Sequence, residues 1–317
     1  MTILGLGAAC VDLSIPVTEE FLSHVHGGKG GALPISLSDL EQLIDQSKQA
    51  PLITCGGSCA NTLKGLAHLG HACQLLSCVG QDSFGIFFQQ TMQQLKISTL
   101  IRQSSLPTTR VLCLITPDGQ RTMRFYTGAS QDISEDQIET IDFSQLRHVH
   151  IDAYSFQHAK LVKHLIQKAD DHHLTISMDL SSYEIVQKYH SLIHEILPFM
   201  TLVFANRNEI YALTHLSPQE GCRQLQTICP IAVILMDKEG CLVGAKGEIF
   251  SVSPFPTQVV DTTGAGDFFN SGFLHRFLHQ DTLVNCARFG NRLGSLIVAV
   301  HGTDLSDREW EIYRNFI

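Results

Sequence analysis

The most informative residues of the chain read Asp261-Thr262-Thr263-Gly264-Ala265-Gly266-Asp267, and the apolar run Phe268-Phe269 follows them directly. Small residues let the backbone turn tightly and leave its N–H groups open, and the helix predicted over about 267–279 adds the positive end of its dipole. The stretch therefore predicts an anion site at a helix start. Asp267 falls in the first turn of that helix, where it faces the anion.

A carboxylate beside a bound phosphate can take the proton from a hydroxyl group that attacks the phosphorus. The backbone amides of Gly264, Ala265 and Gly266 would stabilise the charge on the transferred group. The structural alternative is a glycine-rich helix start capped by an aspartate. The chain contains no GxxxxGK[ST] sequence, so the pattern excludes a P-loop lysine as the phosphate ligand.

The residues outside this loop alternate between apolar strands and amphipathic helices. Strands are predicted at 3–11, 74–79, 147–153, 174–180, 201–205 and 231–236, and helices at 58–69, 83–96, 157–170, 184–197, from 207, and at 283–299. Such alternation predicts an α/β fold in three layers, with a mostly parallel central sheet covered by helices on both faces.

Two parts of the chain do not fit this alternation. Residues 111–126 read as a hairpin around the turn Pro117-Asp118-Gly119, and residues 13–50 are irregular with a glycine-rich centre. We predict that about 13–50 and 100–128 form a small β-sheet lid on a single domain of residues 1–317. A second hairpin is predicted across 241–252.

Composition and charge favour a globular protein and argue against several other classes. Of 317 residues, 44% are hydrophobic and 17% charged, which is ample for a packed core, and the net charge of −9 without a basic run argues against nucleic-acid and anionic-membrane partners. No apolar stretch has the length of a membrane span and the N-terminus lacks a signal-peptide pattern, so a cytoplasmic protein is predicted. Ten cysteines without paired CxxC spacing are expected to fill the core rather than bind zinc or form disulfides.

Several further motifs occur together with the DTTGAGD stretch in one order along the chain. They are Asp12 after the first strand, Gly56-Gly57-Ser58-Cys59-Ala60-Asn61-Thr62, Val79-Gly80-Gln81-Asp82-Ser83-Phe84-Gly85, and Asn206-Arg207-Asn208-Glu209. In this set the chain resembles the ribokinase-like (PfkB) carbohydrate and nucleoside kinases, over about residues 3–303. The resemblance implies a ribokinase-like α/β/α fold with a β-sheet lid that closes over an acceptor sugar.

The resemblance also implies roles for particular residues. Asp267 would be the catalytic base, and the 264–266 amides would form the anion hole. The acceptor hydroxyls would be held by Asp12, Gly57, Ser58 and Asn61. Magnesium and the nucleotide would be held by Asn206, Glu209 (acting on the metal through water) and Asn291.

Two of these assignments have a purely structural alternative. Asp12 suits a turn or cap, and Asn206 with Glu209 has the form of a helix capping box. At Leu235 and Asp237 the chain departs from the family, many members of which have a Thr or Lys followed by a Gly that contacts nucleotide. This departure leaves the preferred phosphoryl donor open.

The implied activity is ATP- and Mg²⁺-dependent transfer of phosphate to a primary hydroxyl of a sugar or nucleoside. The stretch between Asp12 and Gly56 is as long as in the adenosine-kinase branch of the family, and residues 119–123 and 127–130 resemble bacterial members near that branch. An adenosine kinase is therefore the alternative. The resemblance further suggests a homodimer joined through the lids, and it leaves open a monovalent-cation requirement.

Three other functions are weighed against a kinase. Gly5-Leu6-Gly7-Ala8-Ala9-Cys10 half matches a dinucleotide fingerprint, although no helical pattern follows it. His148, His150 and Asp152 alternate on one strand, as in some metal-dependent hydrolases. The third alternative is a non-catalytic sugar- or nucleotide-binding protein that retained the fold.

Overall fold

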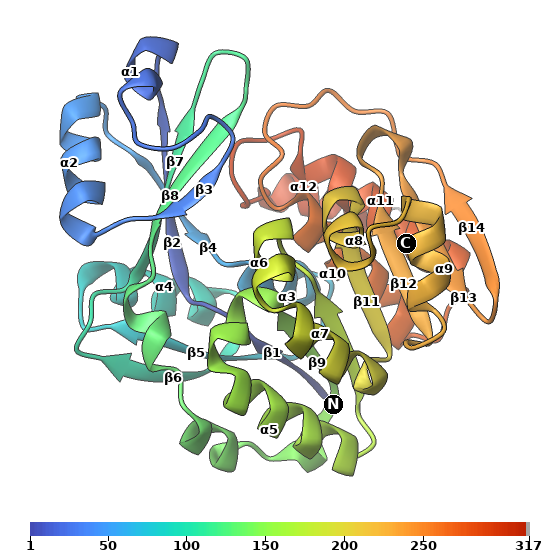
Figure 1. The fold of residues 1–317 in the computed structure, drawn as a ribbon. Coiled ribbons are helices and arrows are strands. Elements are labelled where there is room, and N and C mark those ends of the chain that lie inside the picture. Colours follow the sequence, from blue (N-terminus) through green and yellow to red (C-terminus); the bar gives the residue numbers. More distant parts are fainter. Residues whose placement is uncertain (315–317) are drawn as a thin grey trace.

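The computed structural model describes residues 1–314, and two sheets form its framework (Figure 1). From edge to edge, the nine strands of the large sheet are β14 (Glu248–Val252), β13 (Cys241–Ala245), β12 (Ile231–Leu235), β11 (Leu202–Asn206), β10 (Thr175–Asp179), β9 (Leu146–Asp152), β1 (Thr2–Leu6), β5 (Cys73–Gly80) and β6 (Ser98–Ser104). The five strands of the small sheet are β3 (Ala32–Pro34), β8 (Arg121–Tyr126), β7 (Thr109–Ile115), β2 (Cys10–Pro16) and β4 (Leu52–Gly56).

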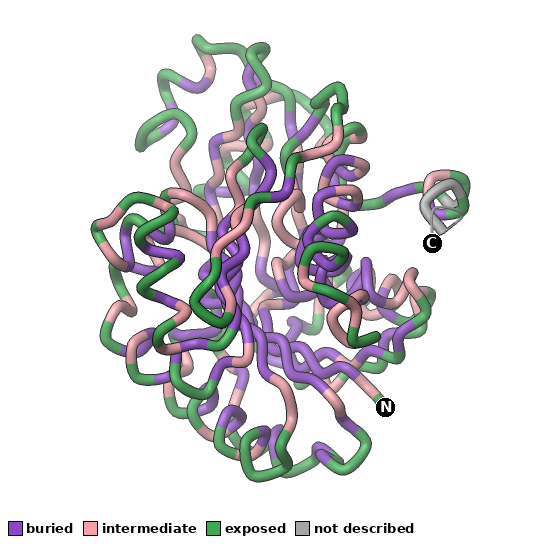
Figure 2. The backbone as a smooth tube through the Cα atoms, turned by 90° about the vertical axis from the view of Figure 1, so that its right-hand side faces the viewer, coloured by how far each residue is buried: buried purple, intermediate pink, exposed green. Residues whose placement is uncertain are grey.

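The large sheet is parallel from β6 to β12, and only β13 runs in the opposite direction, because β13 pairs antiparallel with both β12 and β14. Parallel strands are covered on both faces, which is why they read as continuous apolar runs such as Ile231-Ala232-Val233-Ile234-Leu235. Figure 2 shows that buried residues gather along these central strands. The predicted α/β class with a mostly parallel sheet is confirmed.

Helices form a layer on each face of the large sheet. One layer contains α3 (Ser58–His68), α4 (Ser83–Gln94), α10 (Ala265–Leu278) and α11 (Leu283–Ile297). The other contains α5 (Ala159–Asp171), α6 (Tyr183–Lys188), α7 (His190–Ile196), α8 (Arg207–Thr214) and α9 (Pro218–Leu225). Alternate residues of β1 serve the two cores: Ile3 packs in the α3 layer, whereas Leu4 and Leu6 pack in the α5 layer.

The remaining helices lie outside these layers. The helices α1 (Glu19–Ser23) and α2 (Leu37–Ser47) cover the small sheet, and α12 (Asp307–Arg314) packs Trp310 against Phe268 of α10. Short 3₁₀ helices are η1 (Gly128–Asp132), η2 (Glu135–Thr140), η3 (Phe143–Gln145), η4 (Ala153–His158), η5 (Leu197–Phe199) and η6 (Asp237–Glu239). Among residues 1–314, no helix has both the length and the apolar character to cross a bilayer.

The single strand expected over 3–11 is two strands that belong to different sheets. The chain leaves the large sheet after Leu6, passes through Gly7-Ala8-Ala9, and enters the small sheet at Cys10. A Cβ on Gly7 would lie 2.4 Å from Cys59 Cβ, so only glycine allows α3 to start this close to the passage. An apolar run carries no sign of a change of sheet, because both halves are buried.

The boundaries expected for the lid also shift. Residues 98–104 form β6, which pairs in parallel with β5 at the edge of the large sheet, so the expected 100–128 segment contributes to the small sheet only from β7 onward. The helix α4 connects β5 to β6 and thereby makes a parallel β-α-β unit of the large sheet. The chain thus passes between the sheets after β1, after β4, after β6 and after β8.

Candidate active site

The predicted anion site lies where the glycine loop turns into α10. Gly264 has φ +75° and precedes the first residue of the helix, and a Cβ there would lie 2.9 Å from Thr303 Cγ2. Glycine is therefore needed both for its backbone angle and for space. Of the three amides expected in the anion hole, that of Ala265 donates to Thr262 O at 3.3 Å in this structure.

Asp267 is oriented by the start of α3. Ser58 Oγ donates to Asp267 Oδ1 at 2.7 Å, and Asn61 Nδ2 donates to Asp267 Oδ2 at 2.9 Å. The two helices approach closely because Gly65 of α3 has no side chain: a Cβ there would lie 2.3 Å from Ser271 Oγ. The structure therefore brings the expected catalytic base together with two residues that the sequence assigned to acceptor binding.

The charge on Asp267 is set by opposing effects. Burial raises the pKa of its carboxyl above the ordinary value, while the hydrogen bonds from Asn61 and Ser58 lower it. The net shift is upward, which makes the carboxylate a stronger base than one in water. Because both oxygens are held by donors, its orientation is also fixed.

The start of α3 places Gly57 and Asn61 beside the passage between the sheets. Gly57 has φ +104°, and a Cβ there would lie 2.3 Å from Ala8 O, so no other residue fits. Asn61 is 3% exposed, and its Oδ1 is buried without a hydrogen-bond partner in the structure. That oxygen is thus open to a donor from a bound molecule.

Asp12 reaches the same region from β2 of the small sheet. The nearest atoms to a Cβ on Gly56 would be those of the Asp12 carboxyl group, at 2.3–2.4 Å, which explains a glycine at 56. Burial raises the pKa of Asp12 to about 6, against the lowering effect of the Lys64 ammonium. Lys64 is itself buried, and it donates to Cys55 O and Thr303 Oγ1 and pairs with Asp304.

Carboxylates also gather at the carboxyl ends of three neighbouring parallel strands. Asp152 ends β9 and accepts the amide of Cys59 at 3.1 Å, and Asp179 ends β10 and accepts the amide of Ser181 at 2.7 Å. At the end of β11, Asn206 forms a capping box with Glu209. The backbone N–H of Asn206 donates to Glu209 Oε2 at 2.7 Å, and its side-chain Nδ2 donates to Glu209 Oε1 at 2.5 Å. This end of an open parallel sheet is where ligands bind in α/β folds.

The carboxylates of Asp152, Asp179 and Glu209 are buried, so water does little to screen the repulsion between their charges. Burial raises the pKa of Asp152 to about 6. It also raises the pKa values of Asp179 and Glu209, and the charge of Asp267 raises that of Asp179 further, as the charge of Asp179 does that of Glu209. A cation with oxygen ligands would relieve this repulsion, so the residues fit Mg²⁺ chemically. Both oxygens of Glu209 are occupied by Asn206, which suits contact through water.

The structure adds site residues that the sequence did not single out. Asp179 could have been noticed as a carboxylate at the end of a buried strand. Arg121 of β8 donates to Thr263 Oγ1 in the glycine loop, and its Nε lies 3.9 Å from Asp261 Oδ1. Nothing in the sequence around Arg121 indicates this contact, because it joins the two sheets.

Asn291 and Leu235 were both expected near the nucleotide. The Nδ2 of Asn291 donates to Val252 O and Ser253 O, each at 3.0 Å, so its amide fastens α11 to the end of β14. A Cβ on Gly266 would lie 3.6 Å from Leu235 Cδ1, so Leu235 borders the glycine loop. Asp237 pairs instead with Arg207 at 3.6 Å.

The structure does not favour the rival sequence interpretations. His148 and His150 bond to Thr175 and Ser177 on the adjacent strand, and the carboxylate of Asp152 caps η4, so the three do not converge on a metal. The half-matched dinucleotide fingerprint runs from β1 into another strand and not into a helix. All ten cysteines are buried and free, as expected for core residues.

Comparisons with known proteins give the family. Residues 39–310 match the model of the pfkB family carbohydrate kinases. An uncharacterized sugar kinase of Archaeoglobus fulgidus is 25% identical over 247 residues, which cover 75% of this chain and 96% of that protein.

Solved structures agree over nearly the full length. A probable sugar kinase from Rhizobium etli superposes with a TM-score of 0.92 at 25% identity, covering 99% of this chain and 98% of that one. An adenosine kinase from Sinorhizobium meliloti superposes with a TM-score of 0.90 at 24% identity, covering 99% of both chains. The chain therefore belongs to the pfkB family of carbohydrate kinases, and it is a carbohydrate or nucleoside kinase.

Proposed function

We propose that the protein transfers the γ-phosphate of ATP to a primary hydroxyl group of a sugar or nucleoside, with Asp267 as the general base. The observation that carries this proposal is the placement of Asp267 in the first turn of α10, beside the glycine loop and fixed by Ser58 and Asn61. A base in that place can accept the hydroxyl proton while the hydroxyl oxygen attacks the phosphate.

Other residues of the chain bind the phosphate, the acceptor and the metal ion in this proposal. The glycine loop and the N-terminus of α10 hold the transferred phosphate through backbone amides. Arg121 adds a positive charge from the small sheet, at the loop residue Thr263. Asp12 and the open Oδ1 of Asn61 hold acceptor hydroxyls on the other side of Asp267. Mg²⁺, when bound, neutralises charge on the phosphates, and Asp179 and Glu209 would hold its waters.

Adenosine is the second candidate acceptor. The adenosine kinase from Sinorhizobium meliloti and this chain cover 99% of each other, so the match includes the small sheet and its helices. Those elements lie over the acceptor side of the proposed site. An acceptor larger than a simple sugar is consistent with them.

The test measures ADP release with ATP, Mg²⁺ and a panel of acceptors: adenosine, other nucleosides, ribose, fructose and phosphorylated sugars. Wild-type protein is compared with Asp267→Asn, and we expect acceptor-dependent turnover whose kcat falls by about 10²–10⁴ in the variant. Glu220→Gln is the matched control, because Glu220 is an exposed first-turn carboxylate of α9. Near-wild-type turnover by Asp267→Asn would refute the role of the base. Ligand binding without any turnover would favour a binding protein.

We also propose that two copies pair through their small sheets. The edge strand β4 exposes Leu52 and Ile53, by 52% and 43%, which supports pairing at this edge. Light scattering of wild-type protein and of Leu52→Lys tests this. A dimer that the substitution converts to monomer is expected, and a monomeric wild type would contradict the proposal.

A further inference from the structure

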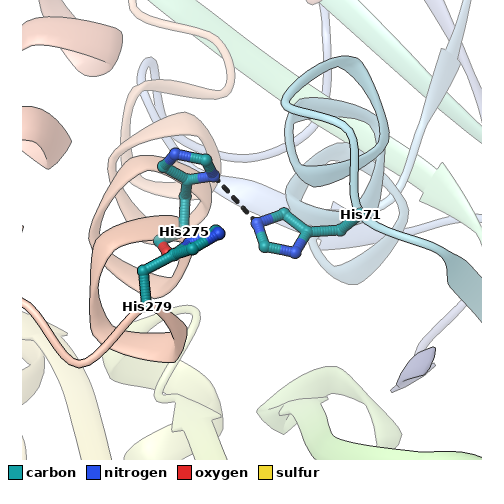
Figure 3. Close-up of side chains that lie close together, drawn as sticks. All are labelled: His71, His275 and His279. Carbon is teal, nitrogen blue, oxygen red and sulfur yellow. Dashed lines mark hydrogen bonds between the residues drawn. The ribbon is translucent and has the colours of Figure 1, made fainter. Parts of the chain in front are cut away.

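Three histidines meet at the ends of α3 and α10 that lie away from the candidate active site. His275 and His279 are one helical turn apart near the end of α10, and His71 follows α3 on the way to β5 (Figure 3). One ring nitrogen of each lies within 4.8 Å of a ring nitrogen of each of the others. His71 Nε2 is hydrogen-bonded to His275 Nδ1 at 2.8 Å, and Figure 3 shows His279 turned toward the same point.

This spacing is near that of a metal site. Three imidazole nitrogens at about 2.0–2.1 Å from one tetrahedral zinc ion would lie about 3.4 Å from one another. The pair at 2.8 Å needs to open slightly, and His279 needs to approach by rotation of its side chain. Two histidines at i and i+4 present their rings on one helix face, which is a common way to chelate such an ion.

Two of the three rings already have the tautomer that ligation requires. The Nδ1 of His279 lies 2.7 Å from His275 O and must carry a proton to bond with it, so the Nε2 of a neutral ring has a free lone pair. His275 Nδ1 accepts from His71 Nε2.

His71 has the opposite tautomer, and Arg147 is the reason. Arg147 Nη2 donates to His71 Nδ1, and a guanidinium only donates, so the proton of His71 lies on Nε2, which faces the other two rings. The Nε of Arg147 is buried and has no hydrogen-bond partner in the structure of residues 1–314. Arg147 is therefore not fully satisfied where it lies, and it adds a positive charge beside the three rings.

We propose that His71, His275 and His279 bind a divalent transition-metal ion, and that Arg147 weakens this site by holding His71 in the wrong tautomer. Imidazole nitrogens suit Zn²⁺, Cu²⁺ and Ni²⁺ rather than Mg²⁺. His71 and His275 are 9% and 7% exposed, whereas His279 is exposed, so the ion enters past His279 and a water completes its coordination.

Such an ion would join the far ends of the two helices that carry the active-site groups. The helix α3 begins at Ser58 and α10 carries Asp267 in its first turn, and these two side chains bond to each other. Both helices also direct the negative ends of their dipoles toward the histidines, which favours a cation there. Binding would stabilise the folded state without touching substrate.

The test uses the full chain, stripped of metal with a chelator and then titrated with Zn²⁺ by calorimetry, with Co²⁺ as a visible probe of tetrahedral coordination. His279→Ala should weaken the tightest site by at least about 10-fold, the lower end of what even a second-shell partner contributes. Its Zn²⁺-dependent rise in Tm should disappear as well. Because His279 is exposed, its truncation leaves the core intact.

The matched control is His194→Ala. His190 and His194 form another i, i+4 pair, on α7, with ring centroids 4.5 Å apart, and neither belongs to the group of three. The control should bind Zn²⁺ as the wild type does. Equal binding by wild type and His279→Ala, or an equal loss in His194→Ala, would overturn the site.

Arg147→Gln tests the second half of the proposal. The glutamine Oε1 can accept a hydrogen bond from a protonated His71 Nδ1, which leaves the Nε2 lone pair free for the ion, and the positive charge is removed. We expect about 10-fold tighter Zn²⁺ binding, the lower end of second-shell effects. Unchanged or weaker binding in this variant would refute the role of Arg147.

Discussion

The guanidinium of Arg121, on the small sheet, donates a hydrogen bond to Thr263 of the glycine loop, which leads into α10 beside the large sheet. The two sheets therefore meet at the loop that is proposed to hold the phosphate. The contact lies between a strand of the first half of the chain and a loop of its last quarter. It is a direct link between the position of the small sheet and the proposed anion site.

Replacing Arg121 should weaken phosphate binding. In Arg121→Gln the charge beside the loop is lost, and a hydrogen bond to a charged group contributes about 1.5–3 kcal/mol. We expect kcat/KM for ATP to fall by about 10–100-fold while the fold is retained. Steady-state kinetics measure this, with Arg102→Gln as the control because Arg102 pairs with Asp136 on the surface. Unaltered kinetics in Arg121→Gln would contradict the role.

Ser58→Ala should shift the pH dependence of the reaction. The base acts when ionised, so activity is lost as the pH falls through the pKa of Asp267, which burial raises. Removing the Ser58 hydroxyl removes a hydrogen bond that lowers this pKa, so the acid limb of the pH–kcat profile should move to higher pH. If Ser58 were only a helix-start residue, the limb would stay in place. The measurement is kcat from pH 4 to 9.

Gly57→Ala should destabilise the protein more than Gly70→Ala. Both glycines have positive φ, +104° and +88°, but a Cβ at 57 would lie 2.3 Å from Ala8 O, whereas nothing lies within 4 Å at 70. Gly70→Ala should cost about 1 kcal/mol from the backbone angle alone, and Gly57→Ala at least about 2 kcal/mol. Urea unfolding compares the two variants. Equal losses would show that the backbone relaxes around position 57.

The pair Asp179 and Glu209 should make stability depend on pH. Their pKa values are raised in the folded state, so the folded protein binds more protons than the unfolded one, and stability falls as the pH rises from the ordinary carboxylate range toward neutrality. Asp179→Asn removes one of the two charges, so its free energy of unfolding should fall less over this interval than that of the wild type.

Comparing the two proteins cancels the buried histidines, whose lowered pKa values act in the opposite direction. Urea unfolding at pH 5 and pH 8 without Mg²⁺ measures the difference. Parallel pH profiles for the two proteins would contradict the raised pKa values.

Local patterns in the sequence predicted the glycine loop, the helix that follows it and the alternation of strands and helices. They did not predict where the chain changes sheets, because Gly7-Ala8-Ala9 lies inside a continuous apolar run. The lid was also expected to include 100–104, although these residues belong to β6, which pairs with β5, and no local pattern shows which sheet a strand joins.

For the site residues too, local motifs predicted the residues but not the contacts between distant parts of the chain. Asp267, Ser58 and Asn61 were expected from motifs, yet the hydrogen bonds among them join residues more than 200 positions apart. The contact of Arg121 with the glycine loop depends on how two sheets pack, which no local pattern records. The nucleotide role expected of Asn291 stays a prediction, and the bonds of its Nδ2 to backbone carbonyls at the end of β14 and just after it are a contact that no local pattern indicates.

The small sheet is built from two separate insertions into the large one, the first between β1 and β5 and the second between β6 and β9. The chain therefore crosses between the two sheets at four places, after β1, β4, β6 and β8. Asp12, one of the proposed acceptor ligands, lies on the small sheet, whereas Ser58 and Asn61 of α3 bond directly to Asp267 on the large-sheet side. Sequence changes in the two insertions can therefore alter the surroundings of Asp12 while α3, Asp267 and the glycine loop keep their sequence.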